Sequence, residues 1–318
     1  MDWKKEYANK IVSVEEAVSH VQSGNRIVFT HACGEAQALT EELVRQADRL
    51  ENVEIVHMVA MGKAPYCQPG MEKHFRHNAL FVGGSTRKAV EEGRGDYTPC
   101  FFHEIPKLFT DGTLPVDVAF LQLSEPDENG VCSYGVSVDY TQPAAEAAKL
   151  VIAQINKNMP YTYGNGINLK DIDYIVEKDE PLIELQPPKI GETEHKIGEY
   201  VASLIHDGDT LQLGIGAIPD AVLSFLGDKK DLGIHSEMFS DGVVDLARKG
   251  VITNKKKTID QGKFVSCFLM GTKKLYDFVN NNPDVLMERV DYTNDPFVVA
   301  KIDNIISINS AMPVSYTH

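Results

Sequence analysis

The feature that most constrains the fold is a predicted strand that runs into a glycine-rich turn and then a helix. Residues 210–213 predict a short strand, Gly214-Ile215-Gly216 follows with little side-chain bulk, and Pro219 suits the first position of a helix. A second short strand starts at 232–234 and ends at Glu237. Ligands bind at the carboxyl ends of the strands in an open α/β sheet. We therefore predict an active site where the turn and the carboxylate share one edge.

The glycine turn and the carboxylate each leave alternatives open. Gly214-Ile215-Gly216 is not a dinucleotide-binding fingerprint, because Pro219 stands where the third glycine would be. It fits either a tight strand–helix turn or an anion or oxyanion site made by helix amides. Glu237 fits either a solvated acid at a strand end or a catalytic group. With His235 and Asp241 it also suggests a metal site, but paired histidines and a downstream PCxxC are absent.

Strands and helices alternate along the chain, which predicts a largely parallel sheet with helices on its faces. The predicted strands are 26–30, 53–59, 80–82, 116–123, 150–155, 210–213, 232–237, 264–269 and 305–308. The predicted helices are 14–21, 36–50, one capped by Ser85, 194–205, 219–226 and 272–280. The Pro-containing segment 183–188 interrupts this order and predicts a boundary between domains 1–186 and 187–312.

The second domain repeats part of the first. Residues 23–29 align with 207–213, and 53–58 align with 232–237. Only the second copy holds the glycine turn and the glutamate, since Met58 takes the place of the acid in the first copy. We expect the other copy to supply a facing wall.

Composition excludes several classes of partner. The chain has 318 residues and a net charge of −15, which argues against nucleic-acid and anionic-membrane partners. No apolar run approaches a membrane span, and the N-terminus is not a signal peptide. An odd number of cysteines without a CxxC indicates reduced thiols in a cytoplasmic protein; these are Cys33, Cys67, Cys100, Cys132 and Cys267. The lysines at 255–257 are expected to form a solvated loop.

Two other residues leave alternatives open. Cys33, near His31, fits a thiol nucleophile or a buried small hydrophobe. Arg87 fits a ligand for a phosphate or an organic acid, or equally a surface salt bridge.

Several motifs together resemble the acetyl-CoA hydrolase/transferase family over nearly the whole chain. The most specific are GIGAIP at 214–219 and HSEM at 235–238. Further matching segments are 84–87, 127–130, 135–140, 156–160, 240–242, 268–273 and 307–311. The resemblance implies two related open α/β domains of the CoA-transferase, NagB/RpiA-like type, with the active site between them.

The resemblance also assigns roles to residues. It makes Glu237 the thioester-forming catalytic residue. It implies a CoA-binding loop made of Gly214, Ile215, Gly216, Ala217 and Ile218. No metal and no permanently bound cofactor is expected, coenzyme A being a substrate, and the full-length protein is expected to be a homodimer.

The implied activity is transfer of CoA between a short-chain acyl-CoA, 4-hydroxybutyryl-CoA or butyryl-CoA, and acetate, by ping-pong chemistry through a glutamyl-CoA thioester. An acyl-CoA hydrolase on the same scaffold and an inactive CoA-binding fragment stay as alternatives, with a sugar-phosphate isomerase more distant. His31, Asp139 and Tyr140 are candidate linings of the acyl pocket.

The chain departs from the family at its end. Family chains are longer and carry a further glycine-rich segment, so the second domain is expected to be incomplete. Residues 313–318 do not continue the family pattern and are expected to be a non-native tail.

Overall fold

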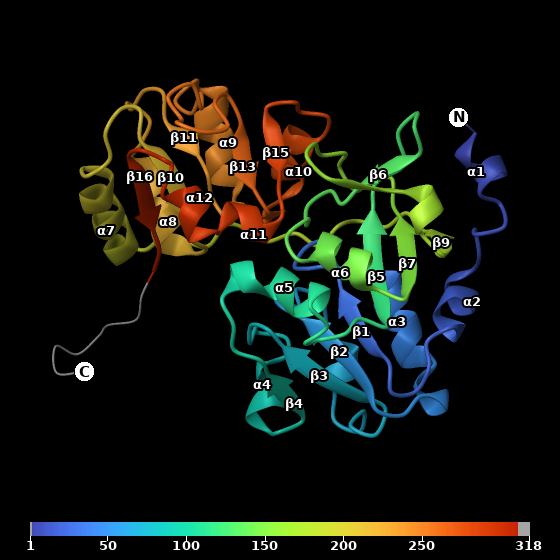
Figure 1. Cartoon of the computed structure of the whole chain (residues 1–318). Helices are drawn as coiled ribbons and strands as arrows, with labels where there is room; N and C mark the ends of the chain where they lie inside the picture. Colours follow the sequence, from blue (N-terminus) through green and yellow to red (C-terminus); the bar gives the residue numbers. More distant parts are fainter. Residues whose placement is uncertain (1, 311–318) are drawn as a thin grey trace. The chain divides into compact units, whose positions relative to one another are not determined.

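The computed structural model describes residues 2–310, and these divide into two compact units (Figure 1). Unit 1 runs to Ile183 and takes in Arg289–Asp291, whereas unit 2 comprises Glu184–Glu288 and the residues from Tyr292 onward. The predicted tail at 313–318 lies outside the described residues. No helix in this described part of the chain has the length and apolar character needed to span a bilayer.

Unit 1 is built on a seven-stranded sheet in the order β4-β3-β2-β1-β5-β7-β9, and every neighbouring pair is parallel. The strands are β1 (Arg26–Phe29), β2 (Val53–His57), β3 (Phe75–Ala79), β4 (Gly95–Tyr97), β5 (Val118–Leu123), β7 (Leu150–Ile155) and β9 (Tyr174–Glu177). The chain order reverses between β1 and β5, which is a topological switch point. The predicted α/β class with parallel strands is confirmed.

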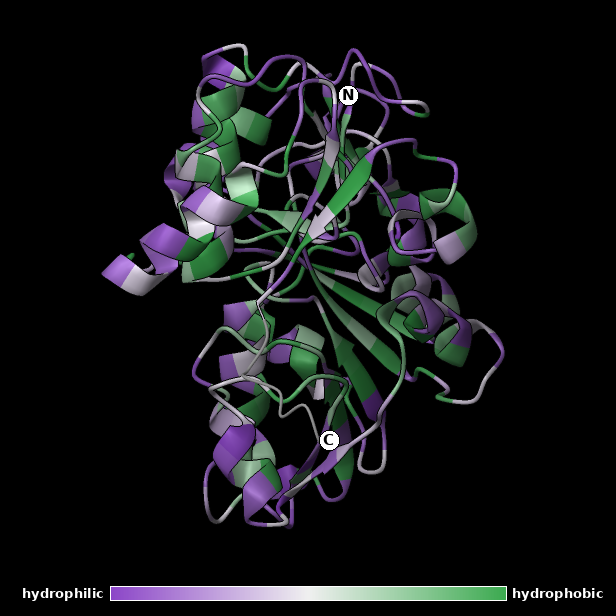
Figure 2. Cartoon of the chain, turned by 90° about the vertical axis from the view of Figure 1, so that its left-hand side faces the viewer, coloured by the Kyte–Doolittle hydropathy of each residue, from purple (hydrophilic) through white to green (hydrophobic). Residues whose placement is uncertain are grey.

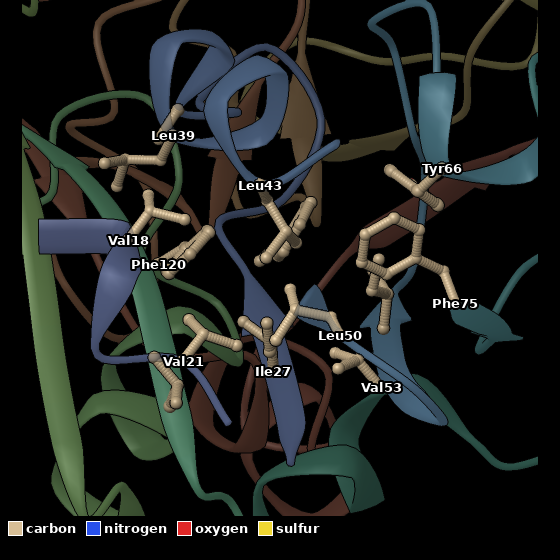
Figure 3. Close-up of a cluster of buried hydrophobic side chains, with 14 of the residues drawn as sticks. Val18, Val21, Ile27, Leu39, Leu43, Leu50, Val53, Tyr66, Phe75 and Phe120 are labelled. Carbon is tan, nitrogen blue, oxygen red and sulfur yellow. The ribbon is translucent and has the colours of Figure 1, made fainter. Parts of the chain in front are cut away.

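Helices cover both faces of this sheet. The helices are α1 (Trp3–Glu6), α2 (Val14–Ser19), α3 (Gln37–Arg45), α4 (Arg87–Glu91), α5 (Ile105–Thr110) and α6 (Thr141–Ala147). On one face Val18 and Leu43 pack with Ile27 and Phe120 in the larger core cluster (Figure 3). The smaller cluster of α5 and α6 covers the other face. Because both faces are buried, the strands are mostly apolar, as their green colour in Figure 2 shows. A short antiparallel pair, β6 (Val131–Ser133) and β8 (Gly166–Asn168), lies outside the sheet.

Unit 2 holds a five-stranded mixed sheet around β10 (Thr210–Leu213). Its other strands are β11 (Gly233–Ile234), β12 (Met238–Phe239), β14 (Phe268–Leu269) and β16 (Ile305–Ile308). β10 is parallel to β11 and β16 and antiparallel to β12. β13 (Phe264–Ser266) and β15 (Val285–Met287) form a separate parallel pair. The helices are α7 (Glu192–Ala202), α8 (Ala217–Ser224), α9 (Asp241–Arg248), α10 (Lys273–Val279) and α12 (Pro296–Val299). A further helix, α11 (Val290–Thr293), has its first two residues assigned to unit 1 and its last two to unit 2.

The aligned repeat has the same strand register in both units. The paired positions are Arg26↔Glu54 and Ile27↔Ile55 in unit 1, and Thr210↔Gly233 and Leu211↔Ile234 in unit 2. Each pair occupies the equivalent place in the alignment of 23–29 with 207–213. The two units therefore share a parallel strand–helix–strand unit, which supports the repeat.

Three predicted strands were wrong. The strand expected at 232–237 covers only Gly233–Ile234 as β11, so Glu237 lies in a bend beyond this strand and not at its end. The strand expected at 80–82 is β3, which precedes it and ends at Ala79, and Phe81 is exposed. The polar residues of β3 lack the apolar pattern by which a buried strand is predicted. His77 and Asn78 are nevertheless buried and bonded to the neighbouring strand. The strand expected at 264–269 breaks at Cys267 into β13 and β14, which pair with different strands.

Some helix boundaries also differ from those predicted. The helix predicted at 36–50 ends at Arg45, and a separate 3₁₀ turn follows at Ala47–Arg49. Ser85 is not a helix cap, because α4 begins one residue later, after Thr86.

Candidate functional site

The glycine turn is shaped by a neighbouring strand and by the start of α8. The Gly214 N–H donates to the Ile308 carbonyl at 2.8 Å, and a Cβ at position 214 would lie 2.6 Å from the Asn309 Oδ1. Gly216 has φ of 121°, which L side chains rarely adopt. α8 begins at Ala217, so Pro219 is its third residue and not its first. The proline still fits, since the first four helix N–H groups have no partner within the helix.

A cavity of about 310 Å³ opens beside this turn, entirely within unit 2. Of the predicted CoA-binding residues, Gly214, Ile215 and Gly216 line it, whereas Ala217 and Ile218 do not. The rest of the lining is Leu185, Gln186, Pro187, Pro188, Asp220, Met238, Ser240, Asp241, Gly242, Asp245, Met270, Gly271 and Lys274.

The charge of the cavity lining is negative. It includes three aspartates and one lysine, and Lys274 Nζ is paired with Asp245 at 2.5 Å. Asp241 accepts from the Thr272 N–H at 3.1 Å and from its hydroxyl at 2.6 Å. Burial, with Asp241 nearby, raises the pKa of Asp220. A neutral, partly apolar part of a ligand therefore suits this cavity better than a phosphate does.

Glu237 lies in the bend between β11 and β12 and is half-buried. Its Oε2 accepts a hydrogen bond from the Asn294 amide Nδ2 at 2.7 Å. Glu237 is not among the cavity-lining residues, although Met238 and Ser240 are. The side chain next to the carboxylate on each side along the chain is buried, with Ser236 and Met238 at 1% and 2% exposure.

The main chain of Glu237 is fixed by the break between β13 and β14. Its carbonyl accepts from the N–H groups of Cys267 at 3.1 Å and Phe268 at 3.2 Å. The Ser266 hydroxyl also donates to it at 3.1 Å. The break that separates the two strands thus turns their donors toward this carbonyl, which holds the backbone in place.

Ser236 joins the glycine turn to the Glu237 bend. Its hydroxyl accepts from the Leu213 N–H at 2.9 Å and donates to the Met238 carbonyl at 2.6 Å. Leu213, which immediately precedes the glycine turn, also pairs with Met238 across the sheet. The structure therefore brings the turn and the main chain of Glu237 together at one sheet edge.

The three residues that suggested a metal each bond to a different group. His235 Nε2 lies 2.9 Å from the Thr293 carbonyl, Asp241 binds Thr272, and Glu237 binds Asn294. Burial lowers the pKa of His235, which favours the neutral ring. Across residues 2–310 no group of three or more His, Cys, Asp or Glu side chains is placed to hold a metal ion.

The candidate pocket residues of unit 1 are buried. Cys33 is 0% exposed, as expected of a small buried hydrophobe. The His31 Nδ1 lies 2.9 Å from Asp139 Oδ2, with both side chains fully buried. The Tyr140 hydroxyl donates to the Phe29 carbonyl at 3.0 Å. None of these residues lines the cavity beside the glycine turn.

Two basic residues differ in environment. Arg87 is exposed and makes no ion pair with any residue that the structure describes. Lys257 is only 3% exposed, so the prediction of a solvated lysine loop is wrong for this residue. Its Nζ donates to the carbonyls of Ile234 at 2.8 Å and Lys263 at 2.6 Å. Burial lowers its pKa to about 8.

Sequence reasoning missed Asn294. It lies between α11 and α12, and Asp295 caps the second of these helices by accepting from Phe297 and Val298. The Asp295-Pro296 pair predicts a helix start, but nothing in the local pattern indicates a contact with a residue 57 positions earlier.

Comparison with known proteins identifies the family. Residues 1–186 match the model of the acetyl-CoA hydrolase/transferase N-terminal domain, and residues 271–317 match that of the C-terminal domain. The second match runs past Met312, where we expected the resemblance to stop.

Similar proteins of known activity and similar solved structures indicate the same family. The chain is 62% identical to the 4-hydroxybutyrate coenzyme A transferase of Clostridium kluyveri, over 99% of this chain and 73% of that protein. It is 36% identical to the butyryl-CoA:acetate CoA-transferase of Anaerostipes caccae, over 99% and 72%. The crystal structure of 4-hydroxybutyrate CoA-transferase from Porphyromonas gingivalis matches with a TM-score of 0.86 at 44% identity, covering 97% of this chain and 74% of that one. The resemblance seen in the motifs is confirmed, and the chain belongs to the acetyl-CoA hydrolase/transferase family.

Proposed function

We propose that this chain transfers CoA between a short-chain acyl-CoA and acetate, with Glu237 as the nucleophile. The acyl donors that we propose are 4-hydroxybutyryl-CoA and butyryl-CoA, the groups named in two of its relatives. One observation carries the proposal. The Glu237 carboxylate accepts from an amide at 2.7 Å, and its main chain adjoins the glycine turn, on a chain 62% identical to a CoA transferase.

The chemistry requires a carboxylate. Glu237 attacks the thioester carbonyl, which forms a mixed anhydride and releases the CoA thiolate. The thiolate then attacks the glutamyl carbonyl, giving a glutamyl-CoA thioester and the free acid. Acetate collects the CoA by the reverse sequence, so the kinetics are ping-pong. A serine or cysteine could accept the acyl group but could not carry CoA itself.

The surroundings of Glu237 support this chemistry. The Asn294 amide donates to the carboxylate and orients it before attack. We propose that the amides of Gly216 and Ala217 stabilise the developing oxyanion, a contribution of about 2.7–4 kcal/mol per donor in comparable sites. Met238 and Phe239 are buried beside Glu237 and limit the access of water.

The five predicted loop residues, Gly214 to Ile218, form the CoA site in this proposal. The negative charge of the adjacent cavity favours the neutral pantetheine arm there over the phosphates. The cavity is therefore a place for the arm that carries the thioester toward Glu237.

The test is a trapping experiment. Wild-type protein incubated with butyryl-CoA alone is expected to form a CoA-bearing, borohydride-sensitive Glu237, seen by mass spectrometry of its peptide. Steady turnover is expected only after acetate is added. Glu237→Gln should form no adduct, whereas Glu199→Gln, an exposed acid on α7, should behave as the wild type.

Two outcomes would contradict the proposal. Steady CoA release without acetate would make the protein a hydrolase, the strongest alternative. Binding of CoA with neither an adduct nor turnover would make it a non-catalytic CoA-binding protein.

We also propose a cytoplasmic homodimer. All five cysteines are free thiols, which fits a reducing compartment. Light scattering on a sizing column tests the dimer, and a monomeric mass would overturn it.

A further inference from the structure

The segment that carries Asn294 is fastened by three consecutive side-chain bonds. The Tyr292 hydroxyl donates to Asp260 Oδ2 at 2.8 Å. The Thr293 carbonyl accepts from His235 Nε2 at 2.9 Å. Asn294 then donates to Glu237 at 2.7 Å. Three neighbouring residues thus have three different anchors, all within unit 2.

Two of these bonds join the same two stretches of chain. His235 and Glu237 are two residues apart, and their partners Thr293 and Asn294 are adjacent. The His235 side chain is 1% exposed and Thr293 is 2% exposed, so neither is free to rotate. The His235 backbone is fixed as well, since its N–H donates to the Leu211 carbonyl at 3.1 Å. Asn294 therefore bonds to Glu237 from a position next to Thr293, whose carbonyl is bonded to His235.

We propose that His235 is a positioning residue for the nucleophile. Its Nε2–H holds the Thr293 carbonyl and so keeps the Asn294 amide against the Glu237 carboxylate. This inference rests on the proposed function, because it assumes that Glu237 is the attacking group.

The ring chemistry argues that stability alone does not require a histidine. A carbonyl accepts only from the tautomer with its proton on Nε2. The other ring nitrogen, Nδ1, is buried with no hydrogen-bond partner among the described residues. A buried polar atom without a partner is unfavourable, and an apolar side chain would avoid this cost. What the histidine supplies is a donor that reaches Thr293.

The test compares two amides that differ in reach. In His235→Gln the amide nitrogen reaches about as far as Nε2, whereas in His235→Asn it stops short. We expect His235→Asn to slow formation of the glutamyl-CoA thioester and kcat about 3- to 10-fold, the value of one neutral hydrogen bond, with little change in KM for acyl-CoA. His235→Gln should recover most of the rate.

A matched control separates positioning from packing. His77 in unit 1 is also buried, at 1% exposure, with Nδ1 3.2 Å from the Ile55 carbonyl and an Nε2 without a hydrogen-bond partner among the described residues. His77→Asn should lower the melting temperature as much as His235→Asn does, with kcat within about twofold of wild type.

The results distinguish this inference from the proposed function. If the wild type forms the thioester and His235→Asn forms it as fast, positioning is refuted and the function stands. Equal slowing in His235→Asn and His235→Gln would reduce His235 to a packing role. If the wild type forms no thioester, the proposed function itself fails.

Discussion

Removal of the Asn294 amide is the most direct test of how Glu237, the proposed nucleophile, is oriented. In Asn294→Ala the Glu237 carboxylate loses a donor at 2.7 Å, a charge-assisted distance. Hydrogen bonds to charged groups contribute about 1.5–3 kcal/mol, which corresponds to about a 10- to 150-fold loss in rate. The backbone of Glu237 stays fixed by Cys267 and Phe268, so the loss should fall on kcat more than on substrate binding.

Asn294→Asp gives the same test a pH signature. A second carboxylate at this distance raises the pKa of Glu237, because two like charges disfavour joint ionisation. The variant should therefore lose rate at a higher pH than Asn294→Ala does, because its attacking carboxylate is protonated first as the pH falls.

The assay is quenched-flow formation of the glutamyl-CoA thioester from butyryl-CoA. Asn282→Ala is the control, since the Asn282 amide donates at 3.0 Å to the Phe278 carbonyl in the same unit. A rate for Asn294→Ala within twofold of wild type, with Glu237→Gln inactive, would refute the role of this bond.

Three further predictions concern stability. Burial raises the pKa of Glu35 from 4.5 to about 7, so the folded state favours its protonated form. The free energy of unfolding should therefore fall by up to about 3 kcal/mol as the pH rises from 4.5 to 7. Glu35→Gln should remove this loss, and equal pH slopes of the urea midpoint would contradict it. Burial lowers the pKa of Lys257 from 10.5 to about 8, so the unfolded chain binds more protons between these values and stability from this group rises with pH. Lys257→Met should lack that rise in melting temperature between pH 8 and 10, and a rise as large as that of wild type would contradict the burial effect. Gly214→Ala places a Cβ 3.3 Å from both the Asn309 Cα and the Ile308 carbonyl and should cost about 1 kcal/mol, whereas Gly227→Ala, with nothing within 4 Å, should melt near wild type. Equal melting temperatures of the two variants would count against the close approach of β16.

The sequence pattern was sufficient to predict those elements whose bounds depend on neighbouring residues alone. The strand at 210–213 and the strand at 305–308 have the predicted bounds, because apolar runs bounded by turn residues are local signals. The sequence also predicted that the glycine turn and Glu237 share one sheet edge, and the structure places the main chain of Glu237 there, although the residue lies beyond the end of β11. The family resemblance rested on the same motifs.

Partners far apart in the chain could not be read from the sequence. Asn294 bonds to Glu237 from a segment whose two preceding residues, Tyr292 and Thr293, bond to Asp260 and His235. Lys257 looked solvated within a basic run, yet two carbonyls draw its Nζ into the interior.

The sequence by itself determined the fold class, the repeat, and the place of the glycine turn and Glu237, because hydrophobic period and turn chemistry act over a few residues. Only the tertiary structure decided what surrounds Glu237. A strand that breaks at Cys267 and an amide from Asn294 both arrive from distant segments. Such contacts depend on how the packed helices and strands bring separate stretches of chain together, and a local sequence pattern does not show which distant residues will meet.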